Sequence, residues 1–162
     1  MTLEEKIIEE LKRKNLTITT TESCTGGLLA GRLLNVPGAS AVFSEGYITY
    51  SNEAKERLVG VSRETLQKYG AVSKQTAMEM AQGVAKVAKA DVGLSTTGFA
   101  GPDGEPPEKP AGLIYVACCI DDYVTYVGCR FTGNREENRD RAVRAALQLL
   151  WRRLQEMDEF VC

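Results

Sequence analysis

The chain has 162 residues, of which 43% are hydrophobic and 26% charged, which is typical of one globular domain with a sizeable core. A formal net charge of −2 at pH 7 gives no basic footprint and argues against nucleic acid as a partner, and no apolar run approaches the roughly 20 residues that cross a membrane. Five cysteines without a metal-binding spacing, and no histidine, favour a cytoplasmic protein with reduced thiols and with neither metal nor cofactor.

Helical and extended patterns alternate along the first two thirds of the chain. The predicted elements there are a helix over 3–14, a strand over 16–21, a helix over 25–35, a strand over 42–50, three helices capped at Ser51, Ser62 and Ser73, and a strand over 91–96. A turn-rich loop over 97–110 follows, then strands over 112–120 and 123–131 joined by a tight turn, and a last helix over about 135–157. No repeat or linker divides the sequence, so we expect a single domain over 1–162.

This order of elements predicts an α/β fold. Strands that alternate with helices form a parallel sheet covered on both faces, and the hairpin near the end adds an antiparallel strand. The sheet should therefore be mixed and mostly parallel. Ligands in such folds bind beyond the carboxyl ends of the strands. Ser23, the segment Tyr50-Ser51-Asn52 and the pair Thr97-Gly98 each stand at or just after the end of a predicted strand, so we expect them to meet at one edge of the sheet.

The stretch from Thr20 to Gly27 is the most informative part of the sequence. Ser23 stands there at a predicted strand-to-helix turn, before two glycines, where free backbone N–H groups can bind a phosphate or an oxyanion. Because the chain has no histidine, a serine nucleophile needs another base, and lysine is the best-attested substitute. The alternative is that Ser23 only caps the helix that starts near Thr25.

Lys55 is the candidate base. It lies one turn into a helix that starts at the same predicted edge, five residues after Tyr50. To accept a proton near neutral pH its pKa must fall by about 3 units from ~10.4, which corresponds to about 4 kcal/mol of bias against the ammonium. The alternative is an ordinary solvated lysine. Cys24, beside Ser23, is interpreted as a small buried residue because no histidine can activate it.

Two further groups of residues are candidates for contact with a substrate. The glycine-rich loop after the strand over 91–96 can supply a wall of backbone donors or a lid, unless it is only an irregular connection. Arginines at the start of the last helix can bind an anion together with the helix dipole, unless they are simply solvated. Three carboxylates are candidates for positioning water or substrate: Glu22, Asp103 and Glu105.

Several stretches in the same order resemble the CinA C-terminal family, the nicotinamide-nucleotide amidases. They are Thr21–Gly27, Gly46–Lys55, Gly70–Ser73, Thr97–Gly104 and Lys109–Gly112. The resemblance implies a three-layer α/β/α fold with a mixed sheet. It also implies a small-molecule nucleotide substrate: the carboxamide of nicotinamide mononucleotide is hydrolysed to nicotinic acid mononucleotide and ammonia.

The resemblance also implies roles for individual residues. Ser23 matches the nucleophile of the family, Lys55 its base, and Tyr50 a tyrosine of the same pocket. Backbone N–H groups near Gly26 and Gly27 would hold the oxyanion. The substrate-binding residues expected from the sequence and the resemblance together are Thr25, Gly26, Gly27, Gly98, Ala100, Gly101, Arg139 and, as a second choice of arginine, Arg135.

Other interpretations of the same sequence stay open. One is a non-catalytic module in which Ser23 and the glycines hold a nucleotide phosphate without turnover. Another is an amidase that acts on a different carboxamide. A second copy of the chain can also pair with the predicted edge strand over 123–131, which makes a homo-oligomer possible.

Overall fold

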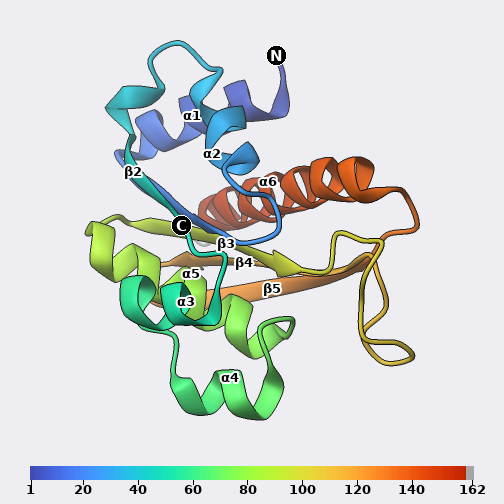
Figure 1. The fold of residues 1–162 in the computed structure, drawn as a ribbon. Coiled ribbons are helices and arrows are strands. Elements are labelled where there is room, and N and C mark those ends of the chain that lie inside the picture. The colour runs from blue at the N-terminus through green and yellow to red at the C-terminus, as the bar shows by residue number, and fades with distance from the viewer. Residues whose placement is uncertain (160–162) are drawn as a thin grey trace.

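A five-stranded sheet between two layers of helices organises the computed structural model, which describes residues 1–159 (Figure 1). The strands are β1 (Ile18–Glu22), β2 (Phe43–Ile48), β3 (Val92–Gly98), β4 (Leu113–Ile120) and β5 (Tyr123–Arg130), in the spatial order β2-β1-β3-β4-β5. β1 pairs in parallel with β2 and β3, whereas β4 is antiparallel to both β3 and β5. Four strands therefore share one direction, which confirms the predicted mixed, mostly parallel sheet.

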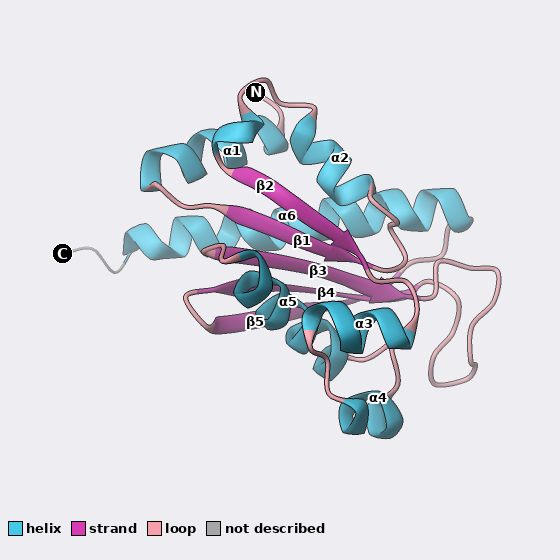
Figure 2. Ribbon diagram, turned by 60° about the vertical axis from the view of Figure 1, so that its left-hand side comes forward, coloured by secondary structure: helices cyan, strands magenta, loops and turns pink. Residues whose placement is uncertain are grey.

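The helices divide between the two faces of the sheet (Figures 1 and 2). They are α1 (Leu3–Lys14), α2 (Leu28–Leu34), α3 (Asn52–Val59), α4 (Arg63–Tyr69), α5 (Lys74–Ala88) and α6 (Arg135–Glu159). α1, α2 and α6 pack together on one face around the largest apolar cluster, and α5 covers the other face with α3 and α4 outside it. The three-layer α/β/α architecture is thus the observed one.

The starts of α3, α4 and α5 follow the predicted serine caps. Ser51, Ser62 and Ser73 each accept a hydrogen bond from the backbone N–H three residues later. A serine at this position satisfies one of the donors that the first turn leaves free, and so fixes where the helix begins. Ser51 thereby sets the register of α3, the helix that carries Lys55.

The start of α2 differs from the prediction. The expected helix over 25–35 begins only at Leu28, because Gly26 and Gly27 adopt φ angles of 54° and 103°. Positive φ is accessible to glycine at little cost and is incompatible with a right-handed helix. The two glycines therefore form a turn between β1 and α2. The first strand also ends one residue later than predicted, at Glu22.

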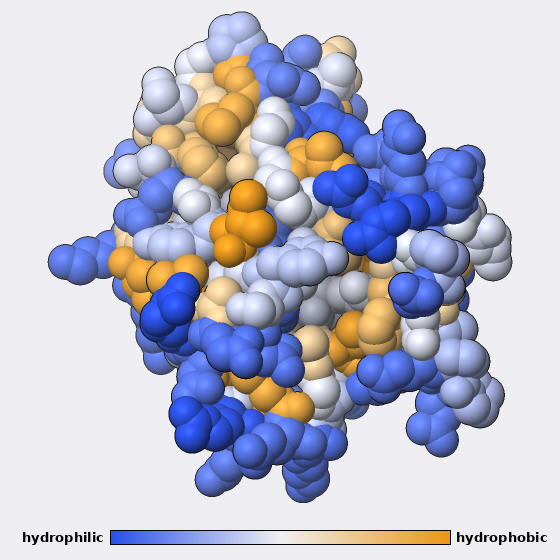
Figure 3. Space-filling model, viewed as in Figure 1, coloured by the Kyte–Doolittle hydropathy of each residue, from blue (hydrophilic) through white to orange (hydrophobic). Residues whose placement is uncertain are grey.

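The surface shows no single dominant apolar area on the face seen in Figure 3, where hydrophobic groups form small, separate clusters among hydrophilic ones. None of the helices within residues 1–159 is both long and apolar enough to cross a membrane.

Candidate active site

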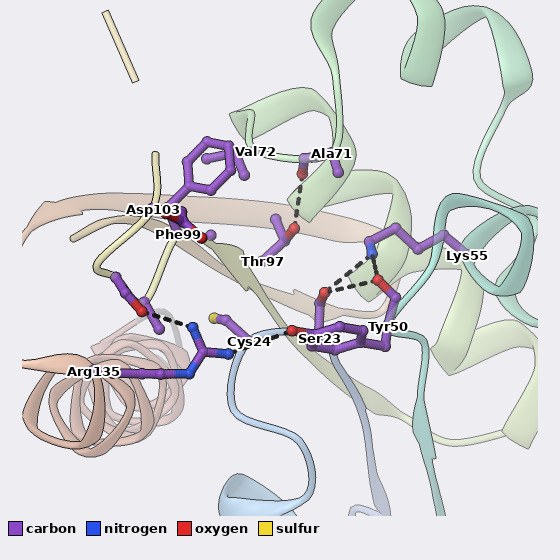
Figure 4. Close-up of a pocket in the computed structure, with 13 residues that line it drawn as sticks. Ser23, Cys24, Tyr50, Lys55, Ala71, Val72, Thr97, Phe99, Asp103 and Arg135 are labelled. Carbon is purple, nitrogen blue, oxygen red and sulfur yellow. Dashed lines mark hydrogen bonds between the residues drawn. The ribbon is translucent and has the colours of Figure 1, made fainter. Parts of the chain in front are cut away.

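The carboxyl ends of the three parallel strands meet at one edge of the sheet, as predicted. Glu22 at the end of β1 is level with Ile48 on β2 and with Thr96 on β3. The residues that follow these ends surround a pocket of about 300 Å³ (Figure 4). Its lining includes Ser23, Tyr50, Lys55, Thr97, Gly98, Ala100, Gly101, Asp103 and Arg135.

Ser23 and Lys55 are in direct contact in this pocket. The Lys55 amine donates to Ser23 Oγ at 3.1 Å, and to the backbone carbonyls of Thr49 at 2.8 Å and Tyr50 at 3.1 Å. Only 1% of Lys55 is exposed, so the interpretation as a solvated lysine is wrong. The interpretation of Ser23 as a helix cap is also wrong, because α2 has Gly27 at its cap position and no side-chain cap bond there.

Burial sets the protonation of the Lys55 amine. It lowers the pKa of Lys55 from 10.5 to about 8, because the desolvated ammonium is disfavoured, while the nearby Cys24 opposes the change. The two carbonyls occupy two N–H groups of the amine. In the neutral form the lone pair is then left to face Ser23 Oγ, the arrangement that a general base requires.

The chain around Ser23 is held on both sides. The Ser23 N–H donates to Thr96 O at 3.0 Å, which continues the pairing of β1 with β3. The Ser23 carbonyl accepts from the N–H of Gly26 at 3.1 Å and closes the turn. A side chain at Gly26 would also meet the guanidinium of Arg139, which lies 3.2 Å from the position of a Cβ. The turn therefore presents the hydroxyl of Ser23 to Lys55 in one orientation.

Glu22 has a structural role that the sequence did not reveal. Its buried carboxylate accepts from the backbone N–H groups of Leu29 at 2.8 Å and Ala30 at 3.0 Å, and from the hydroxyl of Thr25 at 2.5 Å. It thus satisfies the free donors of the first turn of α2 in place of a cap residue. The expectation that Glu22 contacts water or substrate is wrong, since the carboxylate points into α2 and not into the pocket.

Besides Arg139, three expected substrate-binding residues lie outside the lining of the pocket: Thr25, Gly26 and Gly27. Thr25 is buried, and its hydroxyl contacts Glu22 and, at 2.8 Å, Thr96. The Gly26 N–H is already bonded to the Ser23 carbonyl, so it is not free to hold an oxyanion. The two glycines, with positive φ angles, form the turn and do not line the pocket.

The two candidate arginines have separate positions. Arg139 donates to the carbonyls of Cys24 at 2.9 Å and Thr25 at 3.2 Å and does not line the pocket, which corrects the preference for this arginine. Arg135 does line it. Its Nη1 donates to Gly101 O at 2.7 Å and its Nη2 to the hydroxyl of Tyr50 at 3.4 Å. In Figure 4, Arg135 and Lys55 reach the pocket from opposite sides.

Tyr50 contributes to the site in two ways. Its carbonyl accepts from Lys55 and, at 3.4 Å, from the Ser23 hydroxyl. The residue as a whole is 64% exposed, and its phenol hydroxyl accepts from Arg135. The phenol therefore lies at the rim of the pocket and the backbone lies beside Ser23.

Cys24 is buried next to Ser23, as expected of a small filler. Desolvation raises the pKa of its thiol to about 12, although a hydrogen bond with Thr96 acts in the opposite direction. A thiol with this pKa stays protonated near neutral pH and is a poor nucleophile.

The loop after β3 forms the wall of the pocket opposite α3. Gly98, Ala100, Gly101 and Asp103 line the pocket as predicted, and Glu105 does not. The loop is an ordered hairpin, because Glu105 and Lys109 exchange backbone hydrogen bonds and the Lys109 amine donates to Tyr69 O at 2.6 Å.

Comparison with known proteins identifies the family. The profile of the CinA C-terminal domain matches residues 1–154. The chain belongs to this family. A competence-damage inducible protein of Clostridium novyi is 57% identical over 95% of this chain, and a CinA-like protein of Kosmotoga olearia is 50% identical over 94% of it. The chain spans 37% of the length of each of these two relatives.

Solved CinA structures share the fold over almost their whole length. A CinA superfamily protein of Klebsiella pneumoniae has a TM-score of 0.91 at 34% identity, with 95% of this chain and 96% of that one covered. A competence/damage inducible protein of Agrobacterium tumefaciens has a TM-score of 0.90 at 41% identity, with 94% and 93% covered. Membership in the CinA family is consistent with an enzyme.

Proposed function

We propose that this chain is an amidohydrolase that converts nicotinamide mononucleotide and water to nicotinic acid mononucleotide and ammonia. The observation that carries the proposal is the contact between Lys55 Nζ and Ser23 Oγ, 3.1 Å apart and lining one pocket. The choice of substrate rests on the resemblance of the sequence motifs, and membership in the CinA family is compatible with it.

The reaction divides into acylation and deacylation. Neutral Lys55 takes the proton of the Ser23 hydroxyl while Oγ forms a bond to the carboxamide carbon. Lys55 then gives this proton to the leaving nitrogen, the carbon–nitrogen bond breaks, and ammonia departs. In the second half a water molecule loses a proton to Lys55 and adds to the acyl ester. The bond to Ser23 Oγ breaks, the proton returns to Oγ, and the acid is released.

Arg135 is the residue that we assign to the phosphate of the nucleotide. It lines the pocket beside Tyr50, and a guanidinium binds phosphate through charge-assisted hydrogen bonds. Anchoring the phosphate there holds the carboxamide in place and so lowers the entropic part of the barrier.

The test is ammonia release by the purified protein with nicotinamide mononucleotide. Ser23→Ala removes the nucleophile and Lys55→Ala removes the base, so each variant is expected to lose at least about 10³-fold in kcat. Lys74→Ala, on the first turn of α5 and outside the pocket lining, serves as the matched lysine control and should keep full activity. Unchanged kcat in either of the first two variants would rule out the proposed mechanism.

Turnover also separates the competing interpretations. A non-catalytic nucleotide-binding module would bind the mononucleotide without releasing ammonia. An amidase for another carboxamide would show no preference for the mononucleotide over nicotinamide riboside, which lacks the phosphate. We expect kcat/KM to be higher for the mononucleotide.

A further inference from the structure

In the part of the pocket wall that the loop after β3 forms, two buried backbone N–H groups lack an acceptor. Ala100 and Gly101 are both buried and both line the pocket, and among residues 1–159 neither donates a hydrogen bond from its backbone nitrogen. A buried N–H group without an acceptor costs free energy comparable to a lost hydrogen bond, so such groups are rare unless water or a ligand binds them. The pair is therefore a candidate donor site for an oxygen atom.

The carbonyl groups of the same segment explain the direction of these donors. Phe99 O accepts from Gly112 N at 2.6 Å and Ala100 O accepts from Asn138 Nδ2 at 2.9 Å, so both carbonyls are turned away from the pocket. Both peptide bonds are trans, and in a planar trans peptide the N–H points opposite to the carbonyl. The N–H groups of Ala100 and Gly101 therefore point away from Gly112 and Asn138, neither of which lines the pocket.

Asn138 holds this arrangement from the first turns of α6. It is 1% exposed and uses both amide hydrogens, one on Ala100 O and one on Gly133 O at 2.9 Å, while its Oδ1 accepts from Gly133 N at 3.0 Å. A buried amide bonded at three points is rigid. Its bond to Ala100 O also polarises that peptide, which strengthens the Gly101 N–H as a donor.

We propose that the N–H groups of Ala100 and Gly101 bind the carbonyl oxygen of the substrate as it becomes an oxyanion, and that Asn138 is the residue that positions them. This inference rests on the proposed function, because the carbon attacked by Ser23 carries that oxygen. It replaces the expected oxyanion site at Gly26 and Gly27, where the N–H of Gly26 is already bonded and neither glycine lines the pocket.

A fluorophosphonate probe tests the site without reference to the natural substrate. Ser23 Oγ forms a bond to phosphorus, the phosphorus–fluorine bond breaks, fluoride leaves, and the proton passes to Lys55. The product carries a phosphoryl oxygen where the oxyanion would be. In wild-type protein we expect the backbone amide protons of Ala100 and Gly101 to show the largest downfield NMR shifts on labelling. Labelling of Ser23 without these shifts would overturn the inference.

The rate of labelling tests the role of Asn138. Asn138→Asp keeps the size and the acceptor for Gly133 N but loses the amide donors to Ala100 O and Gly133 O. If the Gly101 N–H then loses its position, labelling should slow by about 100-fold, the effect of losing one oxyanion donor. The control is Asn134→Ala, which removes the side chain that accepts from Glu137 N at the same helix end and makes no bond to Ala100. If labelling slowed equally in both variants, the role of Asn138 would be purely structural, which would contradict the proposal.

The two proposals fail in distinguishable ways. If nicotinamide mononucleotide releases no ammonia but the probe labels Ser23 with the expected amide shifts, only the substrate is wrong. If ammonia is released but the amide shifts are absent, only the oxyanion site is wrong. If Ser23 fails to react with the probe and with the mononucleotide, both proposals are overturned.

Discussion

The surroundings of the Lys55 amine determine when it can act as a base. A lysine that acts as a base near neutral pH needs a pKa about 3 units below its ordinary value. Burial accounts for most of this decrease, because it lowers the pKa of Lys55 to about 8. About one tenth of the amines are then neutral at pH 7. Their orientation is already fixed by the carbonyls of Thr49 and Tyr50.

The activity should therefore depend on pH in a defined direction. Lys55 must be neutral to accept the Ser23 proton, and its pKa is about 8, so kcat/KM should rise about tenfold per pH unit below pH 8 and level off above it. Lys55→Arg carries a guanidinium that stays protonated and should be inactive at every pH up to 10 or so. The measurement is the pH profile of ammonia release. A flat profile between pH 6 and pH 8 would contradict the assignment of Lys55 as the base.

At the scale of secondary-structure elements, α6 contacts the site through three side chains. Arg135 and Asn138 hold the loop after β3, and Arg139 holds the turn after β1. Asn138 and Arg139 follow Arg135 by three and four positions, so both are neighbours of Arg135 on the surface of the helix. The same helix thus fixes two walls of the pocket relative to each other.

Variants at the two arginines should separate substrate binding from support of the turn. Arg135→Ala is expected to raise KM for the mononucleotide more than it changes kcat, because the group assigned to the phosphate is lost. Arg139→Ala removes the side-chain donor to the Cys24 carbonyl and one of the two donors to the Thr25 carbonyl, which Leu28 N also serves, so it should lower the free energy of unfolding by roughly 1–3 kcal/mol and reduce kcat. Steady-state kinetics and denaturant titration distinguish the two outcomes. The reverse pattern would restore Arg139 as the substrate-binding arginine.

The sequence predicted the elements more securely than the contacts between them. Serine caps, alternation of strands and helices, and the meeting of Ser23 with Lys55 followed from local patterns and from the resemblance. The role of Glu22 did not follow from these patterns, because its carboxylate accepts hydrogen bonds from backbone N–H groups seven and eight residues later in the chain, beyond a turn. One signal pointed to Asn138: it lies four residues before the buried Ala142, so it is a polar residue on the apolar face of α6.

At the scale of the whole molecule, the site lies at one end of the sheet and a second buried cation lies at the other. Arg153 on α6 donates to Cys118 O at 3.0 Å, to Thr125 Oγ1 at 2.7 Å and to Tyr123 O at 2.9 Å. It joins the β4–β5 hairpin to the helix with hydrogen bonds to carbonyls and a hydroxyl. The residues that line the pocket do not include it.

Stability and activity should therefore respond separately to a change at Arg153. Arg153→Met preserves most of the apolar contact but removes the hydrogen bonds to Cys118 O, Thr125 Oγ1 and Tyr123 O, so the free energy of unfolding should fall by roughly 1–3 kcal/mol. Values of kcat/KM for ammonia release should be unchanged at temperatures where the variant is folded. Loss of activity in a fully folded variant would show that the far end of the sheet is coupled to the pocket.

Glu22 and Ser23 are neighbours in the chain, yet their side chains meet opposite layers of the molecule: Glu22 meets α2, and Ser23 meets α3 through Lys55. The nucleophile Ser23 is thus one residue away from Glu22, which is hydrogen-bonded to α2 on the opposite face of the sheet from α3. We therefore expect that substitutions at the start of α2, where no residue lines the pocket, can change the reactivity of Ser23 through Glu22.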